Sequence, residues 1–154
     1  MNRKPPTPLN SSRTDEDIYR RLRQAREFID ASYHLPLDLG QISRQAYFSP
    51  YHFLRLFKQT FYQTPHEYLT ERRIEKAKQL LISSDLSITE VCLEVGFESL
   101  GSFSTLFHKH TGHPPKLYRT RTLGRLHIAV LWPEIQIPAC YIFRFGPQKS
   151  TPVL

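Results

Sequence analysis

The chain has 154 residues, which is enough for one domain or two small helical units but leaves little room for a separate ligand-binding domain. Its 21 Lys and Arg residues outnumber its 14 Asp and Glu residues, and the resulting charge of +7 favours an anionic partner such as nucleic acid or an acidic membrane surface. Two cysteines are too few for a disulfide framework or a structural zinc site, and no apolar run has the length of a signal-peptide core or a membrane span, so we expect a cytoplasmic protein without a membrane partner.

Residues 1–14 are polar and carry three prolines, so we expect a flexible arm at the N-terminus. A helix is predicted from Asp15 onward, because apolar residues recur there at helical spacing. These residues are Ile18, Leu22, Ala25 and Ile29. The arginines on the other faces of this helix are interpreted as a solvated charged surface, with phosphate contact as the alternative.

A first helix-turn-helix unit is predicted over residues 38–61. Residues 38–41 (DLGQ) have the form of a capping box that begins a short helix, and Ser49 followed by Pro50 is expected to cap a second helix. The apolar residues of the second helix share one face, and they are Phe53, Leu56 and Phe57. Two short helices joined by a tight turn give the outline of a helix-turn-helix.

The same pattern recurs about fifty residues later. Residues 64–67 (TPHE) and 87–90 (SITE) are further capping boxes, the first beginning a bridging helix and the second a short helix. Gly96 then supplies a turn, and Ser99 is expected to cap the next helix. A shift of fifty positions superposes Phe53 on Phe103, Leu56 on Leu106, Phe57 on Phe107 and Pro65 on Pro115. The short supporting helices match at a shift of 49 instead, so the second turn is predicted to be one residue longer.

The predicted fold class is therefore all-α, with two helix-turn-helix units joined by a long bridging helix and followed by a short β-like C-terminal tail. The double helix-turn-helix domain is predicted over residues 15–121. Beyond Arg121 the chain becomes β-branched and aromatic, and we expect strand-like pieces over residues 126–132 and 135–145. The tail, residues 122–154, is too short and apolar to stand alone. It either packs on the helical domain or docks a partner such as RNA polymerase or another protein.

The outward faces of the second helix in each unit are the candidate DNA-reading surfaces, because this helix enters the major groove with its early residues at the base edges. The residues predicted to read bases are Tyr51, His52, Leu54 and Arg55 in the first unit, and Leu100, Gly101, Ser102, Ser104 and Thr105 in the second. The residues predicted to contact phosphate are Ser49, Lys58, Arg73, Ser99, His108, Lys109 and Arg119. Arg55 can donate to two guanine acceptors, whereas the second unit presents short side chains. We therefore expect the first unit to supply most base readout and the second to act through phosphate contact, methyl packing or DNA shape.

No catalytic or metal site is predicted. His108, His110 and His113 are close in sequence, but the first two do not share a helix face and no carboxylate or thiol stands beside them. Cys92 lies on the inner stripe of its helix, and Cys140 lies in the apolar tail without a basic neighbour to lower its pKa. No phosphate loop, nucleophile elbow or carboxylate pair is present, so we expect neither an enzyme nor a cofactor.

The chain resembles the DNA-binding domain of the AraC/XylS family of bacterial transcription regulators over about residues 18–121. The residues that carry the resemblance are Pro65, His66, Glu67, Tyr68, Leu69, Arg73, Ile74, Ala77, Leu80, Leu81, Ile88, Thr89, Glu90, Val91, Gly96, Phe97, Ser99, Phe103, Phe107, Thr111, Gly112, Pro115, Tyr118 and Arg119. The resemblance implies that both reading helices enter adjacent major-groove segments, and that this is a stand-alone DNA reader without a sensor domain. Five residues depart from the family pattern. Ser43 and Cys92 stand where a small Ala is usual, which exchanges one small side chain for another. Tyr47 and Tyr62 replace turn glycines, and Thr105 stands where Arg is common.

We expect a sequence-specific DNA-binding transcription regulator whose partner is double-stranded DNA, bound as a monomer because one chain carries both readers. The alternative is a helical protein-interaction module without specific DNA binding, whose basic face only tunes solubility. Salt separates the two hypotheses, since phosphate contacts make affinity fall steeply with salt concentration.

Overall fold

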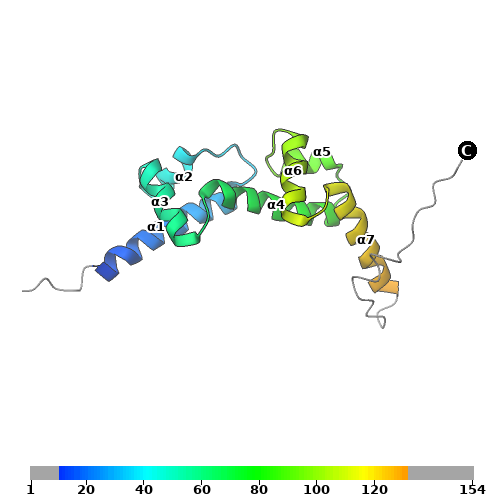
Figure 1. The fold of residues 1–154 in the computed structure, drawn as a ribbon, viewed down its shortest axis with the longest axis horizontal. Helices are drawn as coiled ribbons and strands as arrows, with labels where there is room; N and C mark the ends of the chain where they lie inside the picture. Colours follow the sequence, from blue (N-terminus) through cyan, green and yellow to red (C-terminus); the bar gives the residue numbers. More distant parts are fainter. Residues whose placement is uncertain (1–10, 132–154) are drawn as a thin grey trace, which may run out of the picture.

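The computed structural model describes the backbone of residues 11–131 and the side chains of residues 14–124. Regular structure in this part of the chain is entirely helical, and its elements are α1 (Ser11–Ser32), α2 (Leu39–Gln45), α3 (Pro50–Phe61), α4 (Pro65–Ser83), α5 (Ile88–Glu94), α6 (Leu100–Thr111) and α7 (Pro115–Leu131). Helices α2 and α3 lie near one end of α4, and helices α5 and α6 lie near the other (Figure 1). The predicted arrangement of two helix-turn-helix units around a bridging helix is confirmed.

The three predicted capping boxes begin α2, α4 and α5. The side chains of Asp38, Thr64 and Ser87 each accept a hydrogen bond from the backbone N–H three residues later, and the Gln or Glu at that position accepts one in return. Ser99 also caps α6, accepting from the backbone N–H of Ser102. Ser49 occupies the equivalent position before α3 but its side chain makes no capping bond, so that prediction is right only in position.

The capping boxes give a pH-dependent contribution to stability. Hydrogen bonds from Thr64 hold the pKa of Glu67 below its ordinary 4.5, and bonds from Ser87 do the same for the pKa of Glu90. Because both folded-state pKa values are depressed, this stability is present above about pH 4.5 and is lost as the pH falls through the folded values. A Glu67→Gln, Glu90→Gln double variant should therefore lose less stability than wild type between pH 6 and pH 3 in urea titrations. An equally steep acid loss in both proteins would contradict this.

Each unit has its own apolar core, and α4 contributes to both. The buried residues of the first core are Leu22, Ala25, Ile29, Ile42, Ala46, Phe53, Phe57 and Leu69. The buried residues of the second core are Ile74, Ala77, Leu81, Val91, Cys92, Val95, Phe97, Phe103 and Phe107. The two phenylalanines of α3 lie 5.3 Å apart between ring centroids, and those of α6 lie 5.5 Å apart. The repeat in the sequence is thus a repeat of core packing, which leaves the opposite face of each second helix free.

The two units differ at their turns. Gly96 and Gly112 have φ values of +86° and +75°, and their counterparts Tyr47 and Tyr62 keep the same left-handed conformation at +57° and +59°. The turns of the first unit therefore do not relax to accommodate a side chain, although an L-residue is strained there. The α5–α6 connection is also one residue longer than the α2–α3 connection, as predicted.

Two predicted boundaries are corrected at the ends of the described chain. Helix α1 begins at Ser11, so residues 11–14 of the predicted flexible arm are helical, while the rest of the arm lies outside the described residues. Helix α7 continues to Leu131, across the predicted boundary at residue 121. The strand-like piece predicted over residues 126–132 is therefore wrong as far as Leu131, because these residues are helical.

A short apolar run does not distinguish strand from helix, and extending a helix that already exists costs far less than starting a new element. The second strand-like piece, and any partner surface formed by residues 132–154, lie outside the described residues. No helix in the described part of the chain has both the length and the apolar character needed to cross a membrane.

Candidate DNA-binding face

Helix α3 presents an outward surface that follows from its buried face. Phe53 and Phe57 are fully buried, so the side chains on the opposite side of the helix face outward. Tyr51 is 82% exposed, and Arg55 and Lys58 are also exposed one and two turns further along. Together with Leu54 and Gln59 these three residues line a shallow surface groove. We call Tyr51, Arg55 and Lys58 the α3 ridge.

His52 and Leu54, also predicted to read bases, are less available than Tyr51 and Arg55. Both are only partly exposed. The His52 ring packs edge-on against Phe48, with 5.1 Å between centroids. Leu54 borders a small apolar pocket together with Leu37 and Leu69. Among the four residues of the first unit predicted to read bases, Tyr51 and Arg55 are therefore the two exposed hydrogen-bond donors.

The equivalent face of α6 carries short side chains. Leu100, Gly101, Ser102 and Thr105 are exposed and Ser104 is partly exposed. The hydroxyl oxygens of Ser99 and Ser102 lie 3.1 Å apart at the helix start, and a Cβ added to Gly101 would meet only Ser99 Oγ, at 3.9 Å. The fold thus does not require a glycine there. Further along, His108 and Lys109 are exposed in the last turn of α6.

Arg73 does not project from the surface as a phosphate ligand would. Its Nε donates to the carbonyl oxygen of Tyr33 at 2.8 Å, and its Nη2 donates to that of Leu35 at 2.9 Å. The guanidinium also lies over the Phe97 ring, 5.6 Å from the centroid, and desolvation lowers the pKa of Arg73. These donors are directed at backbone carbonyls between α1 and α2, which favours a structural role for Arg73 over the predicted phosphate contact.

Arg119, also predicted to contact phosphate, makes the same kind of hydrogen bond to the backbone. Its Nε donates to the carbonyl oxygen of Leu81 at 3.0 Å, and its Nη2 donates to that of Leu86. These bonds tie α7 to the end of α4 and to the connection before α5. Both arginines therefore satisfy backbone groups at helix ends and position the helix-turn-helix units rather than face outward.

Arg73 belongs to a contact between the two units that the sequence did not indicate. A Cβ placed on Gly96 would lie 2.7 Å from the carbonyl oxygen of His34, so the turn of the second unit touches the α1–α2 connection of the first. We call His34, Arg73, Gly96 and Phe97 the inter-unit joint. The joint borders a surface groove that also includes Asp38 and reaches Ser99 at the start of α6. The joint thus connects the two units directly, in addition to their connection through α4.

A second polar network fixes α1 to α4. Asp30 accepts from the Tyr68 hydroxyl at 2.9 Å and pairs with Arg72 Nε at 2.6 Å. Burial, with the hydrogen bond to Asp30, raises the pKa of Tyr68 to about 12. The phenol therefore remains a donor throughout the physiological pH range. The hydrogen bond and the ion pair connect α1 with α4.

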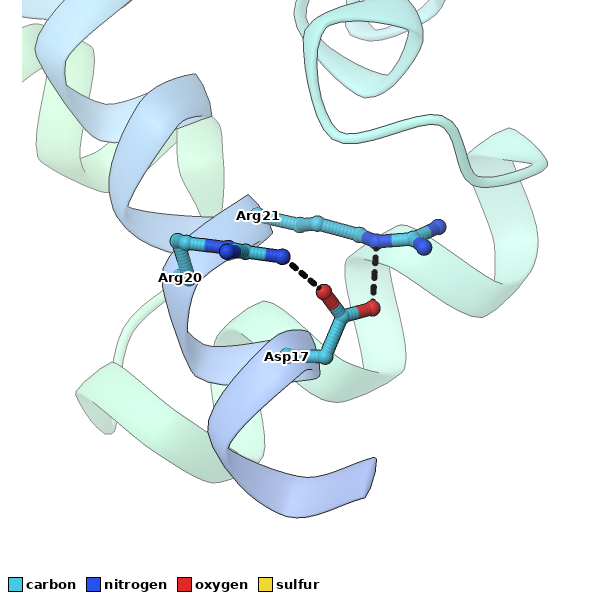
Figure 2. A network of polar contacts seen from close by, with 3 residues as sticks. All are labelled: Asp17, Arg20 and Arg21. Atoms are coloured by element: carbon cyan, nitrogen blue, oxygen red, sulfur yellow. Dashed lines mark hydrogen bonds and ion pairs between the residues drawn. The ribbon is translucent and has the colours of Figure 1, made fainter. Parts of the chain in front are cut away.

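The arginines of α1 are partly neutralised within the helix. Asp17 lies between Arg20 and Arg21 and pairs with both, at 2.8 Å from Arg21 Nε (Figure 2). Arg23 pairs with Glu27 at 3.0 Å. Exposed pairs of this kind contribute little stability. For Arg20, Arg21 and Arg23 they agree with the interpretation of a solvated charged surface, whereas Arg26 is partly buried with its guanidinium 5.0 Å from the centroid of the Phe61 ring.

Catalytic and metal-binding groups are not brought together in the described residues. No cluster of three His, Cys, Asp or Glu side chains there could hold a metal ion. Cys92 is buried, its Sγ lies 3.7 Å from the Phe97 carbonyl oxygen, and burial raises the pKa of its thiol. A thiol in this state is a poor nucleophile. Cys140 lies outside the described residues.

The comparisons with known proteins agree on the fold. The family described as "Helix-turn-helix domain" matches residues 42–121. A transcriptional regulator from Chromobacterium violaceum, described as one of the proteins that contain an AraC-type DNA-binding domain, has a TM-score of 0.63 and 30% identity, covering 67% of this chain and 92% of that one. The DNA-binding domain of AdpA, solved in complex with a target DNA, has a TM-score of 0.62 and 25% identity, covering 75% of this chain and 98% of that one.

Among curated relatives, the bifunctional transcriptional activator/DNA repair enzyme AdaA of Bacillus subtilis is 34% identical over 93 residues, which are 60% of this chain and 44% of AdaA. The chain spans less than half the length of the first curated relatives that it matches. The similarity therefore concerns only part of each of these relatives.

Proposed function

Because the chain belongs to the AraC-type helix-turn-helix family, we propose that it is a sequence-specific DNA-binding transcription regulator that inserts α3 and α6 into adjacent major-groove segments. The observation that carries this proposal is the exposed α3 ridge, a basic and aromatic surface on a helix whose opposite face is fully buried. The structure of AdpA with its target DNA supports double-stranded DNA as the partner. One chain carries both reading helices, so it binds as a monomer, in the cytoplasm where the DNA lies.

The two units divide the work. Arg55 supplies a bidentate donor for guanine and Tyr51 an aromatic edge, so α3 reads bases by hydrogen bonding. Helix α6 has Thr105 at the position of Arg55 and Gly101 at that of Tyr51, so it acts by close approach, methyl packing and DNA shape. Phosphate contacts come from exposed residues at the ends of these helices. They are Ser49, Lys58, Ser99, His108 and Lys109.

The proposed activity is non-enzymatic. DNA repair by AdaA is a property of a protein of which this chain covers 44%. Cys92 is buried with a raised pKa, which argues against a reactive thiol in the helical domain. The chain therefore acts on DNA by binding.

Salt dependence is the experiment that tests this function. A duplex selected from a random library would be titrated with the full chain at 50 to 200 mM salt. With about three to four cationic side chains on phosphate, the slope of log K against log salt should be about −3 to −4, and affinity should fall roughly a hundredfold over this range. A flat response, or no preference for the selected duplex over an unrelated one, would favour a protein-interaction module instead.

A further inference from the structure

The first unit carries three exposed tyrosines at the positions where the second unit has glycine. Tyr47, Tyr51 and Tyr62 are 79%, 82% and 91% exposed. The shift of 49 positions for the turn and 50 for the reading helix places them on Gly96, Gly101 and Gly112. Tyr51 belongs to the α3 ridge and is already assigned to base readout, whereas Tyr47 and Tyr62 have no role in that assignment.

Tyr47 and Tyr62 are unfavourable for folding as they stand. Each has a left-handed backbone, at φ +57° and +59°, which costs an L-residue free energy that glycine does not lose. Rings that are 79% and 91% exposed recover little of this cost through packing. When packing within the fold does not offset the conformational free energy of a strained residue, its side chain is a candidate for a function.

The position of these residues at the two ends of α3 indicates what they contact. Tyr47 lies in the turn before the helix, and Tyr62 is its C-terminal cap. The twelve residues of α3 span about 18 Å at ~1.5 Å per residue, whereas the major groove is ~12 Å wide. When the ridge lies over base edges, the helix ends therefore extend toward the phosphate strands that border the groove. A phenol hydroxyl there can donate to a phosphate oxygen.

We propose that Tyr47 and Tyr62 contact the DNA phosphate backbone on either side of the groove read by α3, and so fix the position of that helix for base readout. The inference rests on the proposed function, which it deepens. The exposed Lys58, one turn before Tyr62, adds a positive charge at the same end of the helix. The second unit has glycines at both places, so it lacks this pair of contacts.

Removing only the hydroxyl groups tests the proposal. Tyr47→Phe and Tyr62→Phe should each weaken binding about three- to tenfold on both a selected and an unrelated duplex, because phosphate is common to all sequences. The slope of log K against log salt should stay unchanged, since a neutral phenol releases no counterion. Thermal midpoints should stay close to that of wild type. Tyr19→Phe, which alters a 49% exposed tyrosine of α1, is the control and should bind normally.

Tyr62→Gly separates a binding role from a structural one. Relief of the left-handed strain should raise its thermal midpoint by about 1–4 °C, while its affinity falls at least as far as that of Tyr62→Phe. Suppose that the wild type binds DNA with a steep salt response, but the two Phe variants bind as tightly as the wild type. That result would overturn this inference and leave the proposed function standing. A loss confined to the selected duplex, or an equal loss in Tyr19→Phe, would also overturn it. A wild type that binds no duplex would remove both.

Discussion

Replacing Gly96 with alanine should destabilise the chain by about 2–4 kcal/mol. Two terms add. The backbone has φ +86°, which disfavours any L-residue, and the new Cβ would lie 2.7 Å from the His34 carbonyl oxygen and 2.9 Å from its carbonyl carbon. Backbone atoms cannot move aside as the end of a flexible side chain can. The turn and the α1–α2 connection must therefore separate.

Gly112→Ala is the matched control, since Gly112 has φ +75° but a Cβ there would meet nothing within 4 Å. The free energy of unfolding of this variant should fall by only about 1 kcal/mol, because its backbone has a positive φ but its new methyl group meets no atom. Urea unfolding of the two variants at equal pH measures the difference, which belongs to the inter-unit joint. Equal losses would show that the joint contact contributes nothing.

The joint also makes a prediction for DNA binding by the Gly96→Ala variant under conditions where it remains folded. If the joint holds α3 and α6 in one relative position, its opening should weaken binding to a full site more than binding to a duplex that carries only the half read by α3. The same ratio of affinities as in wild type would mean that the connection through α4 alone sets the spacing.

The local elements of this fold could be predicted because their signals lie within a few residues. The capping boxes at Asp38, Thr64 and Ser87 pair residues three positions apart, and helical spacing identifies Phe53 and Phe57 as inner residues. The last helix, α7, was not predicted, because the short β-branched and apolar run over residues 126–132 fits either type of element. What decides it is the helix already begun at Pro115.

The site was predicted less fully, because it depends on contacts between distant residues. Arg73 and Arg119 carry the positively charged guanidinium that is typical of phosphate ligands. Each nevertheless donates to carbonyl groups at least 33 positions away in the chain. His52 lies off the inner stripe of α3 but is partly covered by Phe48. The repeat does identify the outward ridge, since exposure there follows from the burial of Phe53 and Phe57. It does not reveal the inter-unit joint.

Arg55→Ala should reduce affinity for a selected duplex about 10- to 100-fold, which corresponds to ~1–3 kcal/mol for a bidentate contact to guanine. The side chain is exposed and belongs to neither core, so the free energy of unfolding should stay within about 0.5 kcal/mol of wild type. Exchange of each base pair in turn should show that the variant no longer discriminates at one or two positions in the half facing α3.

Two other variants decide whether Arg55 acts as a base reader. Lys58→Ala should weaken binding to all duplexes alike and reduce the salt slope by about one, as expected for a phosphate contact. Thr105→Ala alters the residue equivalent to Arg55 in the second unit and should change discrimination by less than about threefold, because a short hydroxyl side chain offers a single weaker bond. If Arg55→Ala weakened all duplexes equally, or if Thr105→Ala cost as much discrimination as Arg55→Ala, base readout would not be concentrated in α3. The division between a reading unit and a close-approach unit would then be wrong, even though the two scaffolds repeat.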